Sequence, residues 1–418
     1  MRNIPAKLFD YRALTLKAEV QTDLAGIFTN IGSYSPPGSA GLGAARPRVT
    51  VLGGATRLMI RIPQPVMAAA TLLLLVGAGV AQEKRYVVID QDAAGPGGTD
   101  MMSILVLLQS PNVQTLGITV VTGDQWRNEE VAHTLRLLEL VGRADIPVVP
   151  GAVYPLVRTQ AETKLWEQQY GKVTYQGAWT RRESNHDPAE VPAMAEGKPA
   201  KLPLNEDAAH FLVRMVHEYP HEVTVYAGGP MTNLALALGL DPHFAELSKG
   251  LVFMGGSLSP RTDDLEYAND PRHEFNLWFD PEAAHIVLRA HWPSMICTTV
   301  DVSVKTRLSQ EMFDQIAKAQ TPAAQYVARY SHPARSYLWD ELAAAAWIDP
   351  TLITAERQLY MDVNLDRGSG YGDTLTWSDR IKPALDLPLV HAQMDVDMAK
   401  FGEMFVDLMT RATPGPKQ

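Results

Sequence analysis

The fold class is decided by residues 86–124, which read YVVIDQDAAGPGGTDMMSILVLLQSPNVQTLGITVVTGD. The apolar, β-branched run Tyr86–Asp90 predicts a buried parallel strand. Gly95–Gly98 breaks the chain, Asp100–Leu108 has the pattern of a helix, and Val113–Val121 has the pattern of a second strand. A strand, a helix and a strand in this order predict a parallel βαβ unit.

The same alternation continues along the chain. Residues 159–203 interrupt it with a polar, aromatic-rich stretch that predicts a lid or loop. We find no internal repeat and no linker, so we expect one large α/β domain with an open, mostly parallel sheet flanked by helices. The further predicted helices are 129–141, 206–217, 232–238, 281–289 and 341–347, and the further predicted strands are 146–149, 223–227, 250–254 and 294–299.

The composition excludes several classes of protein. Of 418 residues, 46% are hydrophobic and 20% charged, which is ordinary for a globular protein. The single cysteine excludes an internal disulfide and a cysteine-based zinc or iron–sulfur site. The net charge of −10 argues against a nucleic-acid partner.

The N-terminal residues differ in charge from the rest. Residues 1–81 carry 8 Lys and Arg against 3 Asp and Glu, and they contain the 16-residue apolar run Val66–Ala81. A membrane-spanning helix needs about 20 apolar residues. Two arginines precede the run and small residues end it, which is the pattern of a secretory signal peptide.

We therefore expect a signal peptide at 59–81, preceded by a disordered leader or mis-assigned start at 1–58, and one domain at 82–418. The protein would be secreted or periplasmic, with no stable membrane span after processing. The alternative is that the apolar run stays as an uncleaved N-terminal anchor. In either case the folded domain lies outside the cytoplasm.

Polar residues follow several of the predicted strands. The carboxyl ends of parallel strands meet at one edge of the sheet, where binding sites form. These residues are Asp90, Asp92 and Asp100; Asp124; the segment Gly228–Asn233; Glu274 and Asn276; and Asp340 at the start of a helix.

Clustered aspartates repel one another unless a cation or a proton lies among them. Oxygen ligands suit Ca²⁺ or Mg²⁺, so Asp92, Asp100 and Asp340, with the Gly228 carbonyl, predict a metal site. Asp92 would then also act as general base toward a water molecule. The alternative is that Asp100 only caps a helix and the other acids are solvated. Gly95–Gly98 lacks the spacing of a nucleotide-cofactor loop.

A family resemblance supports the metal interpretation. The motifs that carry it are VVIDQD, TDMMSILVLLQSPNVQTLGITVVTGD, HTLRLLELVGRADIPVVPGA, GGPMTNLALAL, VFMGG, HEFNLWFDPEAAHIVL and WDELAAAAWIDP. Their order and spacing, from about Tyr86 to Trp377, resemble the inosine-uridine-type nucleoside hydrolases. The resemblance implies an open α/β sheet with Ca²⁺ at the strand ends, and hydrolysis of the N-glycosidic bond of ribonucleosides to base and ribose.

The resemblance also implies residue roles. Asp92 would be a metal ligand and the general base, Asp100 and Asp340 further metal ligands, and Gly228 the donor of a backbone carbonyl. Family members commonly form homo-oligomers. The residues at positions implied to contact the substrate are Asp90, Thr99, Asp124, Asn269, Glu274, Asn276 and Trp339.

Three of these positions depart from the family pattern. Thr99 replaces an aspartate, Asp124 replaces an asparagine, and Trp339 stands where many members have a histidine that protonates the leaving base. Tryptophan cannot serve as an acid, but it can stack on a base. We therefore expect a purine preference, with the leaving base protonated by water or by His273.

The departures leave a second function open. A secreted ribose- or nucleoside-binding protein that kept the metal site but lost turnover would also carry this sequence. Thr99 and Trp339 favour that alternative, whereas Asp92, Glu274 and Asn276 favour the enzyme.

Overall fold

The computed structural model describes residues 84–182, 184–333 and 337–415. They belong to one compact unit, Ala78–Gln418, and the other unit, Met1–Gly77, lies wholly outside the described residues. The leader and signal peptide predicted at 1–58 and 59–81 also lie outside them. None of the helices in the described ranges has both the length and the apolar character to cross a bilayer.

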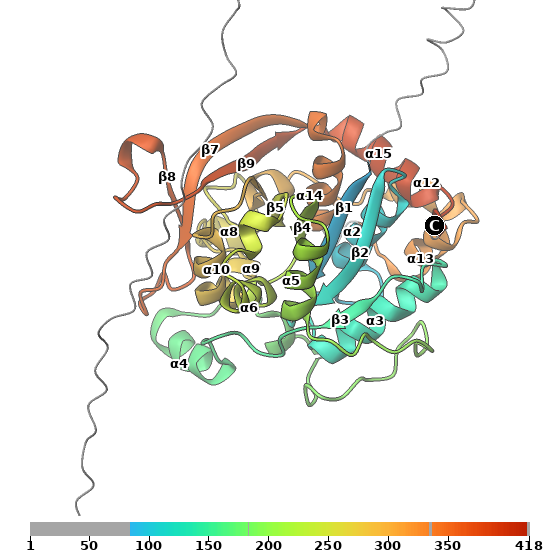
Figure 1. Cartoon of the computed structure of the whole chain (residues 1–418), viewed down its shortest axis with the longest axis horizontal. Helices are drawn as coiled ribbons and strands as arrows, with labels where there is room; N and C mark the ends of the chain where they lie inside the picture. The colour runs from blue at the N-terminus through green and yellow to red at the C-terminus, as the bar shows by residue number, and fades with distance from the viewer. Residues whose placement is uncertain (1–83, 183, 334–336, 416–418) are drawn as a thin grey trace, which may run out of the picture. The chain divides into compact units, whose positions relative to one another are not determined.

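A nine-stranded sheet runs through the unit in the order β3-β2-β1-β4-β5-β6-β9-β7-β8 (Figure 1). The pairings from β3 through to β9 are parallel, and β7 is antiparallel to β9 and β8, so the predicted mostly parallel sheet is confirmed. The strands are β1 (Arg85–Gln91), β2 (Val113–Val120), β3 (Val148–Pro150), β4 (Val223–Ala227), β5 (Gly250–Met254), β6 (Met295–Thr298), β7 (Ile353–Val363), β8 (Thr374–Trp377) and β9 (Leu389–Val396).

The strand order reverses direction at β1. The chain adds β2 and β3 on one side of β1, and then β4, β5 and β6 on the other. The connections that follow β1 and β4 therefore run in opposite directions from the carboxyl ends of these two neighbouring strands. Such a switch point is where open α/β sheets bind their ligands.

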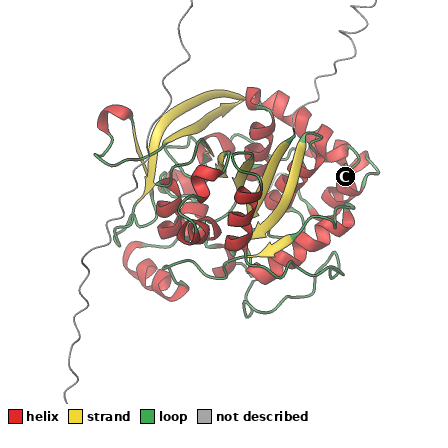
Figure 2. Ribbon diagram, in the orientation of Figure 1, coloured by secondary structure: helices red, strands yellow, loops and turns green. Residues whose placement is uncertain are grey.

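Helices cover both faces of the sheet (Figure 2). The longer ones are α2 (Gly98–Gln109), α3 (Arg127–Leu140), α4 (Gln160–Tyr170), α5 (Ala208–Glu218), α6 (Thr232–Leu240), α10 (Pro281–Leu288), α12 (Gln310–Lys318), α13 (Pro322–Tyr330), α14 (Trp339–Ile348) and α15 (Met398–Thr410). The short ones are α7 (Phe244–Leu247), α8 (Leu265–Asn269), α9 (Phe275–Phe279), α11 (Val300–Ser303), and the 3₁₀ turns η1 (Gly177–Trp179), η2 (Pro350–Leu352) and η3 (Asp379–Ile381).

Two hydrophobic cores form because successive side chains of a strand point to opposite faces. In β1, Val87 and Ile89 pack with α2, α3, α14 and α15, whereas Val88 packs with α5, α6 and α10 on the other face. Both faces of β1 are therefore buried, which explains its nearly continuous apolar sequence.

The segment 159–203 is more ordered than its sequence predicted. It contains α4, where the Thr159 side chain accepts a hydrogen bond from the Glu162 N–H, and the turn η1. Only Thr163 and Glu167 of α4 are buried. A helix that buries so little has no apolar periodicity, so the sequence pattern did not show that this segment contains a helix.

Candidate active site

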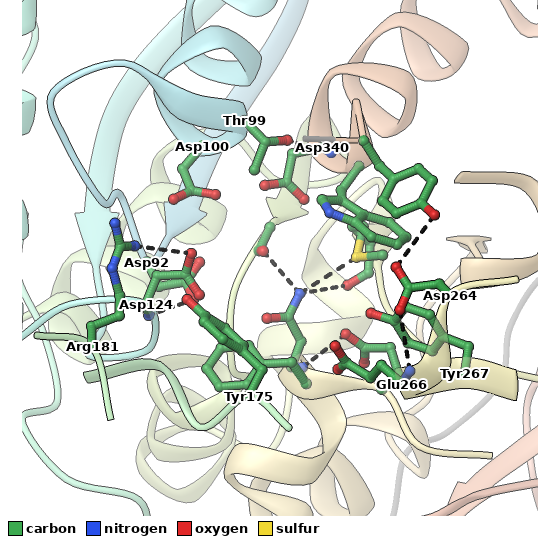
Figure 3. A pocket seen from close by; sticks show the side chains of 17 residues that line it. Asp92, Thr99, Asp100, Asp124, Tyr175, Arg181, Asp264, Glu266, Tyr267 and Asp340 are labelled. Carbon is green, nitrogen blue, oxygen red and sulfur yellow. Dashed lines mark hydrogen bonds and ion pairs between the residues drawn. The ribbon is translucent and has the colours of Figure 1, made fainter. Parts of the chain in front are cut away.

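A pocket of about 380 Å³ lies at the switch point, with seven carboxylates and a single guanidinium among its described lining residues (Figure 3). The loops after β1, β2 and β4, the region of α8 and α9, and the start of α14 build it. Its charged side chains are Asp92, Asp100, Asp124, Asp264, Glu266, Glu274, Asp340 and Arg181.

Asp92 is held between two glycine backbones. A Cβ atom on Gly123 would lie 2.0 Å from Oδ2 of Asp92, and one on Gly229 would lie 2.7 Å from Oδ1. The Asp124 N–H donates to Oδ2 at 3.1 Å. Glycine is therefore required on both sides for the backbone to approach this carboxylate.

Asp100 and Asp340 come from two helices that pack on each other, α2 and α14. Asp100 Oδ2 accepts a hydrogen bond from the Ala94 N–H at 3.0 Å, and Asp340 Oδ2 accepts one from Gln91 Nε2 at 3.2 Å. Both aspartates are buried and face the same pocket. The structure thus brings together the three carboxylates that the sequence predicted as metal ligands.

The hydroxyl of Thr99 stabilises the start of α14. It donates to Glu341 Oε2 at 2.5 Å and accepts from the Asp340 N–H at 3.3 Å. Thr99 lines the pocket as expected, but its only hydroxyl proton is used within the protein. Its principal contact in this structure is with the helix that carries Asp340.

Burial raises the pKa values of Asp92, Asp100 and Asp340, and the neighbouring carboxylates raise them further. The three groups cannot all ionise without a compensating cation. The donor set consists of oxygen atoms, which suits a hard divalent ion. Among the described residues, no group of three or more His, Cys, Asp and Glu has the arrangement of a metal site.

Asp124 is paired with Arg181, whose Nη1 lies 3.5 Å from Asp124 Oδ2. Arg181 follows η1, which docks on the loop after β2 because the Ala178 N–H donates to the Gly123 carbonyl at 2.8 Å. Sequence reasoning missed Arg181. The available signal was Asp124 itself, since an aspartate in place of an asparagine adds a partly buried charge that needs a partner.

Glu274 and Asn276 are fixed by backbone groups. Glu274 caps α9, accepting from the N–H groups of Asn276 (2.8 Å), Leu277 (3.0 Å) and Gly256 (3.0 Å). Asn276 Nδ2 donates to the Gly228 carbonyl at 2.9 Å. A carbonyl oxygen has a second lone pair, so Gly228 keeps one for a further partner. All these groups face the pocket where the sequence predicted them.

Trp339 belongs to an aromatic wall of the pocket. Its ring centroid lies 4.6 Å from that of Tyr337 and 5.8 Å from that of Tyr267, and all three residues line the pocket. Figure 3 shows Tyr267 on the side of the pocket away from Asp92. The wall offers an apolar surface opposite the carboxylates of the strand ends.

Two predicted substrate contacts lie elsewhere. Asp90 is buried and does not line the pocket; its Oδ1 accepts from Thr119 Oγ1 (2.5 Å) and Asn233 Nδ2 (2.8 Å). It lies within β1, so neighbouring elements cover it. Asn269 is exposed at the end of α8 and lines a neighbouring cavity of about 500 Å³. Neither side chain therefore faces the carboxylate pocket in this structure.

His273 also lines the neighbouring cavity and not the carboxylate pocket. It is buried, and burial lowers its pKa to about 4, so the imidazole is neutral at pH 7. It therefore does not fit the expected role of proton donor to a leaving base. The pocket-lining residues that sequence reasoning did not single out as site residues are Tyr175, Arg181, Met254, Asp264, Glu266, Tyr267, Phe275 and Tyr337.

The contact between Gly123 and Asp92 predicts the effect of a single methyl group. Gly123→Ala should lower the free energy of unfolding by about 1–3 kcal/mol, because Asp92 or its loop must move to admit the Cβ atom. Gly239→Ala in α6 is the control, since its Cβ atom would meet nothing within 4 Å. Urea unfolding measures both. A Gly123→Ala variant as stable as wild type would contradict the packing described here.

Comparison with known proteins agrees with this geometry. The family model described as inosine-uridine preferring nucleoside hydrolase matches residues 87–403. Probable uridine nucleosidase 2 of Arabidopsis thaliana is 30% identical over 247 residues, which cover 59% of this chain and 69% of the relative. Pyrimidine-specific ribonucleoside hydrolase RihA of Photobacterium profundum is 31% identical over 245 residues, with 58% and 69% covered.

Solved structures share the fold. A purine-preferring ribonucleoside hydrolase from Gardnerella vaginalis superposes with a TM-score of 0.63 at 22% identity, covering 78% of this chain and 98% of that one. A plant nucleoside hydrolase superposes with a TM-score of 0.62 at 24% identity, covering 78% and 99%. The family match runs from β1 into α15, and the chain therefore belongs to the inosine-uridine preferring nucleoside hydrolase family.

Proposed function

We propose that this protein is an exported, calcium-dependent hydrolase that cleaves the N-glycosidic bond of ribonucleosides or related N-ribosides, releasing base and ribose. Family membership supports the reaction class. The observation that carries the proposal is the pocket of seven carboxylates around Asp92. Such a pocket stabilises the positive charge that develops on a sugar when its glycosidic bond breaks.

Asp92 is the group we assign as general base. Its carboxylate is fixed by the Asp124 N–H and by the close backbones of Gly123 and Gly229. A fixed acceptor removes the proton from an attacking water while the water oxygen bonds to the anomeric carbon. Glu274 and Asn276 lie in the same pocket, where they can orient the sugar hydroxyls.

Calcium is proposed from the donor chemistry. Asp92, Asp100 and Asp340, with the Gly228 carbonyl, would hold the ion. When bound, the ion would neutralise these carboxylates and orient the sugar diol. Export is proposed from the sequence of residues 59–81 alone.

Release of reducing sugar from a panel of nucleosides tests the function. The wild-type protein should release ribose, and Asp92→Asn should lower kcat by about 10²-fold or more, because the amide keeps the shape but cannot accept the proton. Asp386→Asn is the control, since its side chain is 92% exposed. Measurable nucleoside binding without sugar release from any nucleoside would instead support the non-catalytic binding protein.

Metal analysis of dialysed protein tests the ion site. We expect bound calcium in the wild-type protein and in Asp386→Ala, and a large loss in Asp340→Ala, because a ligand from α14 is gone. The binding constant for added Ca²⁺ should weaken in the same variant. Equal occupancy in Asp340→Ala and wild type would remove Asp340 from the ligand set.

The base preference rests on Trp339. Stacking of a base on an aromatic ring is worth about 1–3 kcal/mol, and a purine offers the larger face. Trp339→Ala should therefore lower kcat/KM more for inosine than for uridine, with little change in Tm, and Trp339→Phe should restore part of the loss. A large fall in Tm with unchanged turnover per folded molecule would mean that Trp339 only packs the helix.

A further inference from the structure

We propose that Glu266 is the general acid that protonates the leaving base, an inference that rests on the proposed N-glycosidic hydrolysis. Glu266 lies in α8 and lines the carboxylate pocket with 18% of its side chain exposed. Figure 3 shows Glu266 and Asp264 on one side of the pocket, and Asp92 and Asp124 on the other. A proton donor and a proton acceptor therefore face the pocket from opposite sides.

A general acid must lie on the side of the pocket where the base binds. Tyr267, the next residue in α8, has its ring centroid 5.8 Å from that of Trp339. A base stacked on Trp339 therefore lies on the side of the pocket that carries Glu266. The sugar would then extend toward Asp92 and the strand ends.

The other groups near this side fit the role less well. Asp264 uses both carboxylate oxygens as acceptors, from the Glu266 N–H and from the Tyr337 hydroxyl, which is itself the donor in that bond. Trp339 has no titratable proton, and His273 is neutral and lines the neighbouring cavity. The pKa of Tyr267 is raised well above its usual value by burial and nearby acids, so this phenol releases its proton less readily. Arg181 lies on the opposite side of the pocket, where it is paired with Asp124.

Glu266 titrates near neutral pH, so a large share of its carboxyl groups is protonated there. Burial raises its pKa to about 7, and the charges of Asp264, Glu274 and Asp124 contribute. A hydrogen bond from Thr174 opposes these effects. His273 Nε2 lies 3.6 Å from Glu266 Oε1. The other titratable groups that line the neighbouring cavity with Glu266 are Tyr170, Lys172, Asp270, Tyr371 and Asp373, and Lys172 is paired with Glu167.

The reaction balances with these two carboxyl groups. The bond from the anomeric carbon to the base nitrogen breaks, its electron pair stays on the base, and the base takes the proton of Glu266. Water adds to the anomeric carbon and loses its proton to Asp92. Glu266 ends ionised and Asp92 protonated, and exchange with solvent restores both. Glu266 also lines the cavity of about 500 Å³, which gives water a route to it.

Substrates with different leaving groups test the assignment. Glu266→Gln should lower kcat for inosine by about 10²- to 10⁴-fold, since the amide cannot donate the proton. The loss for p-nitrophenyl ribofuranoside should be at least about tenfold smaller, because nitrophenolate leaves without protonation. In the wild-type protein, kcat for inosine should fall as the pH rises through about 7, where Glu266 ionises. This alkaline limb of the pH–rate profile should be absent in Glu266→Gln.

A second variant shifts the pKa of Glu266 and leaves its carboxyl group in place. Asp264 caps α8 by accepting from the Glu266 N–H at 3.1 Å, and the carbonyl oxygen of Asn can accept the same bond. Asp264→Asn removes a negative charge, so the pKa of Glu266 should fall and the alkaline limb should move to lower pH. Glu246→Gln, on the exposed surface of α7, should leave the limb in place.

The outcomes separate the two proposals. Equal losses on both substrates in Glu266→Gln, no loss at all, or an unmoved limb in Asp264→Asn would overturn the assignment of Glu266. A wild-type protein that cleaves neither substrate would overturn the proposed function itself. If Glu266→Gln does not fold, the position of the alkaline limb in the pH–rate profile of Asp264→Asn decides whether the assignment of Glu266 holds.

Discussion

Repulsion among buried aspartates is the constraint on which this site depends. Asp92, Asp100 and Asp340 face one pocket, and burial together with the charge of neighbouring carboxylates raises the pKa of each. Such a group is stable only with protons, with a cation, or opposite a substrate that becomes positive. The proposed calcium ion and the proposed cationic transition state of glycosidic hydrolysis both satisfy this constraint.

The fold supplies this arrangement through its topology. Because β1 lies between β2 and β4, the loops after all three strands meet around Asp92. Gly123 and Gly229 come from two of these loops and lie against the Asp92 carboxylate, where no side chain would fit. Packing of α14 on α2 then places Asp340 in the same pocket as Asp100.

The sequence predicted the parts of this arrangement that depend on local pattern. The strands at 223–227 and 250–254 were predicted to the residue, because buried parallel strands have continuous apolar sequence. Arg181 and Glu266 were not predicted as site residues, because they reach the pocket through the docking of η1 and the position of α8. Asp90 lies outside the pocket, where Thr119 and Asn233 donate to it from neighbouring elements, and spacing in the sequence does not show this.

Diffraction from crystals of the calcium-loaded protein tests the central claim most directly. Anomalous scattering locates calcium without reference to activity. The account predicts one strong peak among the carboxylates of Asp92, Asp100 and Asp340, next to the Gly228 carbonyl. A catalytically active protein with no peak there, or with calcium bound only at another place, would contradict it.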